Sequence, residues 1–473
     1  MSQSPSPARP AEPADSTAAH ADGWADLLSG RHLASVLVMA SGVLLYAMNL
    51  YFTAALMPSI VEDIGGQAYY AWVTTAFVVS AIVGSLSVSR ILDWKGSAAA
   101  YLIAFSIFFV GAMGNAASPT MALLIASRAI QGLGGGLLVG LGYAVIRTAL
   151  PARHWARAAG VVSAMWGVGT LFGPALGGLF AELGLWRASY AALAAVALLL
   201  AAVVRHSFAG SAGSGHRAPV PAVSLFVLIL ATLAISLSAV LPMGWPALAA
   251  IGIGLALLGL FIAVERRSRH TILPALAYQR GNTLKWVNLT VAALSAGVVM
   301  ENFIPLFAQR LAGLSPLLAG LLGAVLSLAW TCAQLFIVSV RSDTTRRRAI
   351  RLGPLLLAAA LTGYGLLQTD GAGPSIVAVW ALLLAVAGTG IGLAWPLLGV
   401  AAMSSTQDAA EGGKAAAAIS TTQLIALSIT SALGGTLMAA GGESIADAAR
   451  YATLGIALLV LPGIFTARIV TRQ

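Results

Sequence analysis

Long apolar stretches, separated by short polar segments, recur along the chain from about residue 30 to its end. Most are near the length of about 20 residues that a helix needs to cross a bilayer. The pattern predicts fourteen helices, near residues 32–59, 70–89, 98–115, 120–147, 158–181, 188–205, 222–241, 246–264, 286–308, 316–339, 351–367, 375–400, 414–438 and 448–468. The sequence therefore predicts an all-α polytopic membrane protein.

The composition agrees with a membrane protein. Of the 473 residues, 59% are hydrophobic and only 9% are charged, which is too few to cover a water-soluble globule. The single cysteine, Cys332, excludes an intramolecular disulfide and a cysteine metal site. Residues 1–30 are rich in Pro, Ala and Ser without an apolar core, so we expect a disordered cytoplasmic tail and no signal peptide.

The basic residues are distributed unevenly between the two sides of the predicted membrane. Of 26 Lys and Arg residues, 22 fall on the side of the chain termini, three (Arg187, Arg310 and Arg450) fall on the other, and Arg128 lies within a span. Lys and Arg concentrate in cytoplasmic loops. We therefore expect both termini in the cytoplasm, a location in the cytoplasmic (inner) membrane, and no nucleic-acid partner behind the net charge of +10.

Two polar segments divide the chain into parts. Residues 207–220, SFAGSAGSGHRAPV, have the small-residue composition of a linker, and residues 265–285 form a basic amphipathic segment expected along the lipid headgroups. The predicted division is a tail (1–30), an N-terminal six-helix bundle (31–206), a part with the linker, two additional helices and the basic segment (207–285), and a C-terminal six-helix bundle (286–473).

A glycine-rich string, GVGTLFGPALGG, occupies residues 167–178 of the fifth helix. Gly169, Gly173 and Gly177 recur at every fourth position and give one face without side chains, and Pro174 is expected to kink the helix. One interpretation is a helix-packing patch of a kind common in membranes. The other is a gating element, in which the glycine face packs against a helix of the other half.

Several motifs carry a resemblance to a known family: SRILDWKG at residues 89–96, RAIQGLGG at 128–135, the fifth-helix string, ERRSRHTILPALAYQRGNT at 265–283 and FAQRLAGLSPLLAGL at 307–321. Together they resemble the fourteen-span drug:proton antiporter branch of the major facilitator superfamily. The resemblance implies the major facilitator fold, two six-helix bundles plus two helices between them, and efflux driven by a proton gradient without a cofactor. Asn49 stands where the family usually has an aspartate.

Two ionisable residues fall well inside predicted spans, where charge is costly and marks functional hypotheses. Glu301 is either a proton-coupling acid or a carboxyl near the outer mouth, solvated or paired with Arg310. Arg128 either takes part in proton movement, as the resemblance implies, or is a structural hydrogen-bond partner of Gln131. By the same resemblance, Asp93 and Gly96 serve gating, with Asp93 capping the helix that begins near Gly413.

Substrate is expected between the two halves near the middle of the membrane, among aromatic, methionine and amide side chains. The candidates share a similar predicted depth. They are Tyr46, Asn49, Tyr51, Gln131, Met165, Trp166, Asn302, Trp330, Gln334, Trp395 and Gln423. Trp330 and Gln334 are four residues apart and should share a helix face. Because Asn49 replaces an acid, we expect neutral, zwitterionic or anionic amphiphiles rather than lipophilic cations.

The sequence thus predicts a monomeric, proton-coupled antiporter that exports a small amphipathic compound by alternating access, with protons and membrane lipids as its other partners. Alternatives are an exporter of one metabolite, siderophore or lipid, and a transport-inactive receptor or a membrane-embedded enzyme. The glycines at 132–136 lie in a predicted membrane helix, so they do not form a phosphate-binding loop. The sequence shows no metal-ligand cluster and no nucleophile triad, so an enzyme is not expected.

Overall fold

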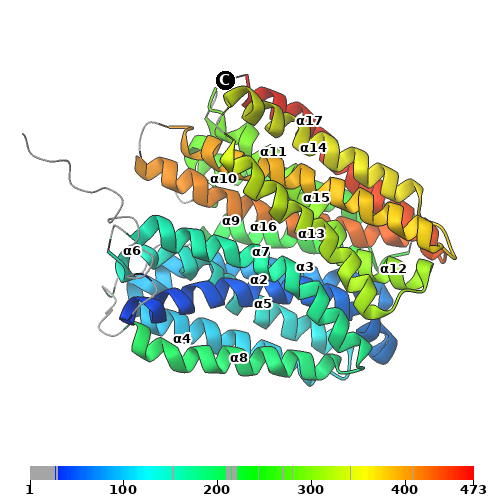
Figure 1. Cartoon of the computed structure of the whole chain (residues 1–473), viewed down its shortest axis with the longest axis horizontal. Helices are drawn as coiled ribbons and strands as arrows, with labels where there is room; N and C mark the ends of the chain where they lie inside the picture. The colour runs from blue at the N-terminus through cyan, green and yellow to red at the C-terminus, as the bar shows by residue number, and fades with distance from the viewer. Residues whose placement is uncertain are drawn as a thin grey trace, which may run out of the picture.

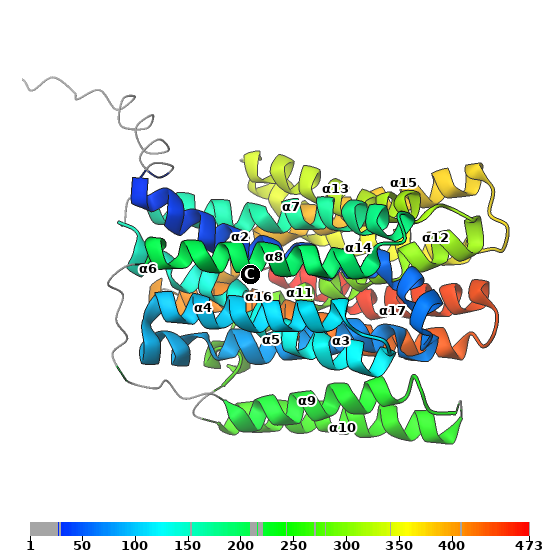
Figure 2. The same ribbon diagram turned by 90° about the horizontal axis from the view of Figure 1, so that it is seen from below.

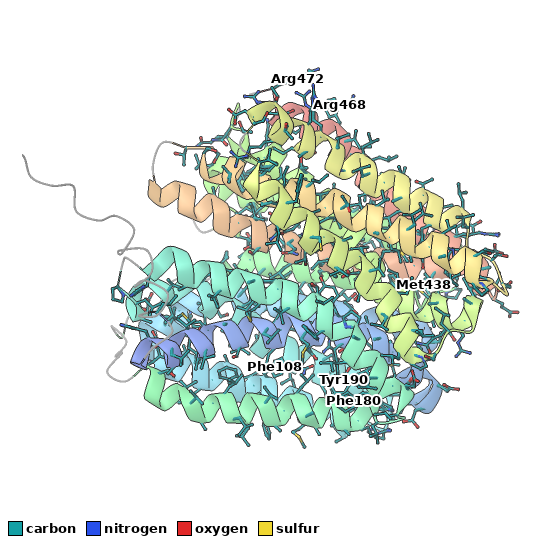
Figure 3. The ribbon with its side chains drawn as sticks, viewed as in Figure 1. Phe108, Phe180, Tyr190, Met438, Arg468 and Arg472 are labelled. Carbon is teal, nitrogen blue, oxygen red and sulfur yellow. The ribbon has the colours of Figure 1, made fainter. Side chains whose placement is uncertain are left out.

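The computed structural model describes residues 27, 30–151, 154–208, 215, 221–242, 244–268, 271–279, 281–340, 342–406 and 409–472. Over these residues the regular structure is helical, and the helices lie side by side in a bundle (Figure 1). Large aromatic and aliphatic side chains fill the space between the helices, including Phe108 and Tyr190 in the N-terminal half (Figure 3).

The N-terminal half consists of long helices from the first 207 residues. They are α2 (Gly30–Ile64), α3 (Tyr70–Leu86), α4 (Val88–Ala116), α5 (Met121–Ala144), α7 (Trp155–Glu182) and α8 (Trp186–Ser207), with the short η1 (Gln67–Tyr69) and α6 (Ile146–Ala149) between them. α2 packs along α7, and α3 and α4 both pack along α5. Thr120 caps α5 by accepting a hydrogen bond from the Leu123 amide.

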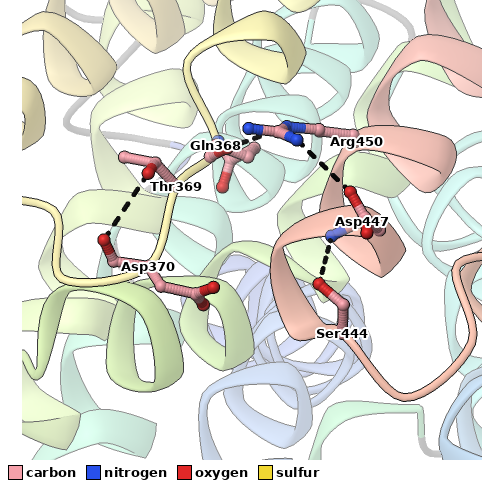
Figure 4. A network of polar contacts seen from close by, with 6 residues as sticks. All are labelled: Gln368, Thr369, Asp370, Ser444, Asp447 and Arg450. Atoms are coloured by element: carbon pink, nitrogen blue, oxygen red, sulfur yellow. Dashed lines mark hydrogen bonds and ion pairs between the residues drawn. The ribbon is translucent and has the colours of Figure 1, made fainter.

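The C-terminal half repeats this arrangement. Its helices are α11 (Leu284–Val298), η4 (Val299–Asn302), α12 (Ile304–Ala312), α13 (Pro316–Ser339), α14 (Asp343–Leu366), α15 (Pro374–Met403), α16 (Ala409–Ala440) and α17 (Ile445–Val470). Ser315, Ser342 and Ser444 cap α13, α14 and α17. Arg450 joins the ends of α14 and α17, since it donates to the Gln368 carbonyl and pairs with Asp447 (Figure 4).

α9 (Ala222–Leu237) and α10 (Trp245–Arg267) lie between the two halves in sequence and form an antiparallel pair at the edge of the bundle (Figure 2). α9 contacts α3 of the N-terminal half and α16 of the C-terminal half. Gly254 lets the two helices approach, because a side chain there would meet Ile235. The short η3 (Ala275–Tyr278) follows α10 and packs against α11.

Twelve stretches of the described residues are long and apolar enough to cross a membrane. One of them, Gln67–Ala116, runs over both α3 and α4, and the apolar α9 is shorter than the rest. The protein is thus a multi-pass membrane protein, and the count of fourteen spans stays a prediction, as do the predicted domain boundaries.

The polar segment at residues 89–96 differs from the loop expected between the second and third spans. α4 already begins at Val88, and the chain changes direction inside it at Gly96, where φ is 79° and ψ is 174°. Only glycine adopts this backbone conformation readily, because it has no Cβ. The segment is therefore a short helical turn that ends in a glycine bend.

The predicted ninth helix, near residues 286–308, is wrong as a single helix. α11 ends at Val298, the 3₁₀ turn η4 covers Val299–Asn302, and α12 begins at Ile304. Pro305 explains the break, since it has no amide hydrogen to donate to the carbonyl four residues before it, that of Glu301. The backbone around Glu301 is therefore interrupted inside the bundle.

The two halves meet most closely at the end of the bundle where α7 and α12 end and α3 and α13 begin, which we call the closed end. There Glu182 of α7 accepts hydrogen bonds from the Ser315 hydroxyl and the Leu317 amide, at 3.0 and 3.1 Å. Tyr70 of α3 stacks on Phe303, with ring centroids 5.9 Å apart. Toward the opposite end, where α2 begins and α17 ends, the halves diverge (Figure 1).

Candidate functional site

Glu301 lies in η4, at the seam between the two halves. Its side chain is 2% exposed, and the Ser327 hydroxyl of α13 donates a hydrogen bond to its carboxyl. The phenol of Tyr51, from α2 of the other half, faces the same carboxyl, although its hydroxyl completes no hydrogen bond of normal geometry with a described residue. The carboxyl therefore has one neighbour from each half.

The predicted alternative for Glu301, a solvated carboxyl or one paired with Arg310, does not describe this structure. Arg310 is exposed near the end of α12, whereas Glu301 is buried at the break before it. Among the described residues the carboxyl accepts a hydrogen bond from the Ser327 hydroxyl and forms no ion pair. A buried acid without a cationic partner is therefore present at the seam.

Asn302 follows Glu301 and connects the same turn to α3. The Tyr70 hydroxyl donates to the Asn302 carbonyl at 3.1 Å, and the Asn302 side chain is buried. Ser431 of α16 in turn donates to the Ala71 carbonyl at 3.5 Å. η4 is thus linked to the N-terminal half through both α2 and α3, on the closed side of the seam.

Arg128 lies fully buried in α5, within the N-terminal half. Its guanidinium donates to the Gln131 side chain at 2.6 Å, and Asn115 of α4 donates to the same oxygen at 2.8 Å. It also lies over the Phe77 ring, 4.1 Å from the centroid, which is cation–π geometry. The predicted contact between Arg128 and Gln131 is confirmed, and a part in proton movement stays a prediction.

The guanidinium has further hydrogen-bonding capacity. Within the described residues, its Nε and Nη2 atoms find no acceptor. The phenols of Tyr46 and Tyr190 lie nearby, and the Tyr190 hydroxyl is bonded to Thr53 at 3.1 Å. Asn49, where an acid was expected, is fully buried in α2, and neither polar atom of its amide has a partner in the described part of the chain. Two donor atoms of Arg128 and both polar atoms of Asn49 are thus unpaired among the described residues.

Two pairs of aromatic side chains lie on either side of the contact between α7 and α13. Tyr46 and Trp166 have ring centroids 5.5 Å apart in the N-terminal half, and Trp330 and Trp395 are 5.5 Å apart in the C-terminal half. Between them, a side chain at Gly167 would contact Thr331 at 3.5 Å. The three tryptophans are partly exposed, so they can line a substrate path between the halves.

The remaining substrate candidates lie at different positions relative to the aromatic pairs, Arg128 and Glu301. Trp330 donates to Gln334 at 3.2 Å, which confirms that they share a helix face. Met165 is half-buried in α7, and Gln423 is buried in α16. Tyr46 and Gln131 belong to the surroundings of Arg128, whereas Tyr51 and Asn302 belong to those of Glu301. Tyr46 contacts Trp166 and lies near both Arg128 and Tyr51, so these groups adjoin one another.

The face of Gly169, Gly173 and Gly177 packs against α2 of the same half, so the expected partner in the other half is wrong. Side chains at these positions would meet Ala47, the Met48 carbonyl and the Phe52 carbonyl. A different face of α7 contacts α13: a side chain at Gly178 would lie 2.6 Å from the Pro316 carbonyl, and one at Gly320 would meet the Pro174 carbonyl. α7 thus packs closely on both sides, and its gating role stays a prediction.

Asp93 is exposed on the second turn of α4, and its carbonyl accepts a hydrogen bond from the Gly215 amide. The side chains of residues 409–414, where its latch is expected, lie outside the described residues. The latch therefore stays a prediction.

Ser327, Asn115 and Tyr70 were not among the sequence candidates. Ser327 lies three and seven residues before Trp330 and Gln334, so helical spacing places it on their face. Asn115 is an amide in an otherwise apolar stretch of α4. No local pattern marks Tyr70, since its contact with Asn302 depends on how the halves meet.

Comparisons with known proteins agree with this architecture. A family model described as Major Facilitator Superfamily matches residues 39–431. The chain therefore belongs to the major facilitator superfamily, whose transporters carry small-molecule substrates.

Among characterised sequences, the chain is 40% identical over 461 residues to proteins named probable multidrug-efflux transporters in two strains of Mycobacterium tuberculosis. This match covers 95% of the chain and 97% of the relatives. The chain is also 26% identical to multidrug resistance protein 3 of Bacillus subtilis, over 79% of the chain and 73% of that protein.

Among solved structures, the chain resembles a D-xylose-proton symporter, with a TM-score of 0.64 and 16% identity over 93% of this chain and 97% of that one. It also resembles a bacterial homologue of the human lysosomal transporter Spinster in an inward-facing, unoccupied conformation, with a TM-score of 0.66 and 14% identity over the same shares of both chains. At these identities the likeness concerns the fold, and the major facilitator fold is the expected one.

Proposed function

We propose that the protein is a proton-coupled antiporter that exports small amphipathic compounds across the cytoplasmic membrane, with both termini in the cytoplasm. The observation that carries the proposal is the position of Glu301. Glu301 is a buried acid at the seam, with Ser327 on one side and Tyr51 of the other half facing it. Separation of the halves would therefore change the hydration of this carboxyl strongly. The efflux direction is supported by the names of the similar proteins.

The physical basis of the coupling is the cost of burying charge. An ionised carboxylate without a cationic partner is costly in an apolar interior. We expect Glu301 to hold a proton while the closed end is closed around it, and to release the proton when the halves separate and water reaches it. A substrate that stabilises one conformation then exchanges with a proton through the same movement. No cofactor is required, because the gradient supplies the energy.

The proposed substrate path is lined by the aromatic pairs Tyr46–Trp166 and Trp330–Trp395. Flat or apolar groups can stack on these rings, and Gln334 offers a polar contact beside them. Arg128 retains donors for an acceptor group, and Asn49 adds an uncharged amide in place of an acid. These features favour neutral, zwitterionic or anionic amphiphiles over permanent cations.

Two measurements on the purified full chain test the proposal. In a weakly buffered solution, addition of a transported compound should release protons that a pH indicator detects. A transport panel in proteoliposomes with an imposed pH gradient should include lipophilic cations, neutral amphiphiles, acidic amphiphiles, siderophores and lipids. We expect gradient-driven transport of uncharged and acidic amphiphiles; strong selectivity for permanent cations would contradict the substrate assignment, and transport indifferent to the gradient would contradict coupling.

A further inference from the structure

The end of α9 lies across the seam between α3 and α16, at the closed end. The Trp72 indole of α3 donates to the Ser236 carbonyl of α9 at 2.9 Å, and the hydroxyls of Ser238 and Thr436 are 2.5 Å apart. α3 and α16 also touch each other here, because a side chain at Gly435 would lie 2.7 Å from Ala71. If α3 and α16 move apart when the closed end opens, α9 can keep its contact with only one of these two helices.

The contact of α9 with α16 is the closer of the two. The same Gly435 faces Ala239 just beyond α9, where a side chain would lie at 3.4 Å, beside the hydroxyl pair of Ser238 and Thr436. By contrast, α3 and α9 meet around a small crevice. Its lining is apolar apart from one hydroxyl, and consists of Val79, Ile82, Leu225, Leu228, Ile229 and Thr232. Apart from the Trp72–Ser236 hydrogen bond, the α3 side of α9 therefore offers mainly contacts between apolar side chains.

The other end of the pair is attached to the C-terminal half through the described residues of the α10–α11 connection. Glu265, 1% exposed at the end of α10, accepts hydrogen bonds from the Ile272 and Leu273 amides and the Tyr278 hydroxyl, at 3.0, 3.1 and 3.0 Å. Burial and the neighbouring carboxylate raise the pKa of Tyr278, so its phenol stays protonated and continues to donate. One carboxyl therefore holds the start of the α10–α11 connection in place.

The connection is then joined to the C-terminal half itself. η3 packs against α11, and the Asn282 amide donates to the Ser405 carbonyl, just after α15, at 3.2 Å. The side-chain oxygen Oδ1 of Asn282 accepts a hydrogen bond from the Leu284 amide at 2.8 Å, at the start of α11. The α9–α10 pair is thus attached to the C-terminal half near both of its ends.

We propose that α9 and α10 move with the C-terminal half as one body, and that the α3–α9 interface is the surface along which they separate from the N-terminal half. The Trp72–Ser236 hydrogen bond is then a latch that stabilises the closed end and breaks when it opens. The inference rests on the relative movement of the halves in the proposed function and goes beyond it by assigning the inserted pair to one half.

Spin-label distances on the full chain test the inference, in a Cys332→Ser background that removes the only native thiol. Leu123 (α5), Leu248 (α10) and Leu366 (α14) lie near the closed end and are 46, 60 and 65% exposed. The Leu123–Leu366 pair reports the movement of the halves over a pH series. Under conditions in which the Leu123–Leu366 pair shows two distances, we expect the Leu123–Leu248 pair to show two distances as well. We expect the Leu248–Leu366 pair to show a single distance.

The possible outcomes separate this inference from the proposed function. Two distances for Leu248–Leu366 would overturn the inference, whether or not Leu123–Leu248 also changes, because the pair would then move with the N-terminal half or independently. A single Leu123–Leu366 distance under all conditions would contradict the movement of the halves, and with it both proposals.

A second variant tests the latch. Trp72→Phe removes the indole donor and keeps an aromatic ring, so the population of the longer Leu123–Leu366 distance should rise about fivefold, the effect of one ordinary hydrogen bond. Trp245→Phe is the matched control, because Trp245 is 81% exposed at the start of α10 and should leave the populations unchanged. Equal populations in Trp72→Phe and the wild-type protein would show that the Trp72–Ser236 bond does not act as a latch.

Discussion

Glu301 lies where it does because of a proline four residues later in the chain. Pro305 cannot donate to the Glu301 carbonyl, so α11 gives way to a 3₁₀ turn and α12 begins anew. A 3₁₀ stretch between two helices often marks a functional hinge. The carboxyl is thereby placed on an irregular segment that touches Ser327 and faces Tyr51, rather than on the side of a regular helix.

The break can be tested by restoring the missing donor. Pro305→Ala allows α11 and α12 to join into one helix, which should rotate Glu301 away from Ser327 and Tyr51. We expect gradient-driven transport to fall at least tenfold while the protein still folds, because the change favours helix formation locally. Transport in proteoliposomes and helix content by circular dichroism provide the readouts.

Pro462→Ala is the matched control for this change. Pro462 also lies inside a helix, α17, but it is exposed and distant in sequence from the acid. It should leave transport within about twofold of the wild-type protein. If Pro305→Ala retained full transport, the break would not be needed to position Glu301.

At the level of single residues, the sequence predicted the two charged residues inside the membrane spans but only part of their surroundings. Glu301 and Arg128 stand out because charge is rare in apolar stretches, and the contact of Arg128 with Gln131 follows from local spacing along one helix. The approach of Tyr51 to Glu301 and of Tyr70 to Asn302 depends on how distant helices meet, which no local pattern specifies.

α7 is packed closely by different glycines against two different neighbours. Gly173 faces α2 within the N-terminal half, where a side chain would lie 2.9 Å from the Met48 carbonyl. Gly178 faces α13 across the seam, 2.6 Å from the Pro316 carbonyl. Under the proposed movement of the halves, the first contact stays within one half, and the second breaks when the closed end opens.

Leucine substitutions should therefore have different effects at these two positions. Gly173→Leu should lower stability by about 1–3 kcal/mol, as overpacking does, and reduce transport. Gly178→Leu should leave the stability of each half nearly unchanged and shift the population toward the open form of the closed end. Thermal unfolding measures the first effect, and the Leu123–Leu366 spin-label distance measures the second.

Gly160→Leu provides the control within the same helix, since no described atom lies within 4 Å of a side chain built at Gly160. It should change neither the melting temperature nor the distance distribution. Equal effects of Gly173→Leu and Gly178→Leu would contradict the division of α7 into a fixed face and a moving face.

The spacing of glycines predicted one smooth face of α7 correctly but not its partner. A four-residue repeat places Gly169, Gly173 and Gly177 on one side of a helix, and any neighbouring helix can satisfy such a face. The order of helices within a bundle is set by contacts between distant segments. The break in the ninth predicted helix, in contrast, had a local signal in Pro305.

For the whole molecule, the sequence predicts the fold well, whereas the orientation of the protein in the membrane stays a prediction. Apolar stretches and family motifs together predicted the major facilitator fold, which the comparisons confirm. The termini are predicted in the cytoplasm because 22 of 26 basic residues fall on their side of the predicted topology.

Single cysteines in the Cys332→Ser background test the orientation. Leu183 and Asp370 lie at the closed end, and Arg348 lies at the opposite end, near the start of α14; all three are exposed. In intact cells a membrane-impermeant thiol reagent should label cysteines at positions 183 and 370 but not at 348. Labelling at 348 alone would place the termini outside and reverse the proposed direction of transport.

The central claim is that Glu301 couples transport to protons, and its most direct test is Glu301→Gln in proteoliposomes. The variant keeps a polar side chain of similar size but cannot ionise. With a fluorescent amphiphile chosen from the transport panel, the wild-type protein and the exposed control Glu62→Gln should both accumulate substrate under a pH gradient. Glu301→Gln should lose gradient-driven accumulation while still binding the compound. Full gradient-driven accumulation by Glu301→Gln would contradict the claim.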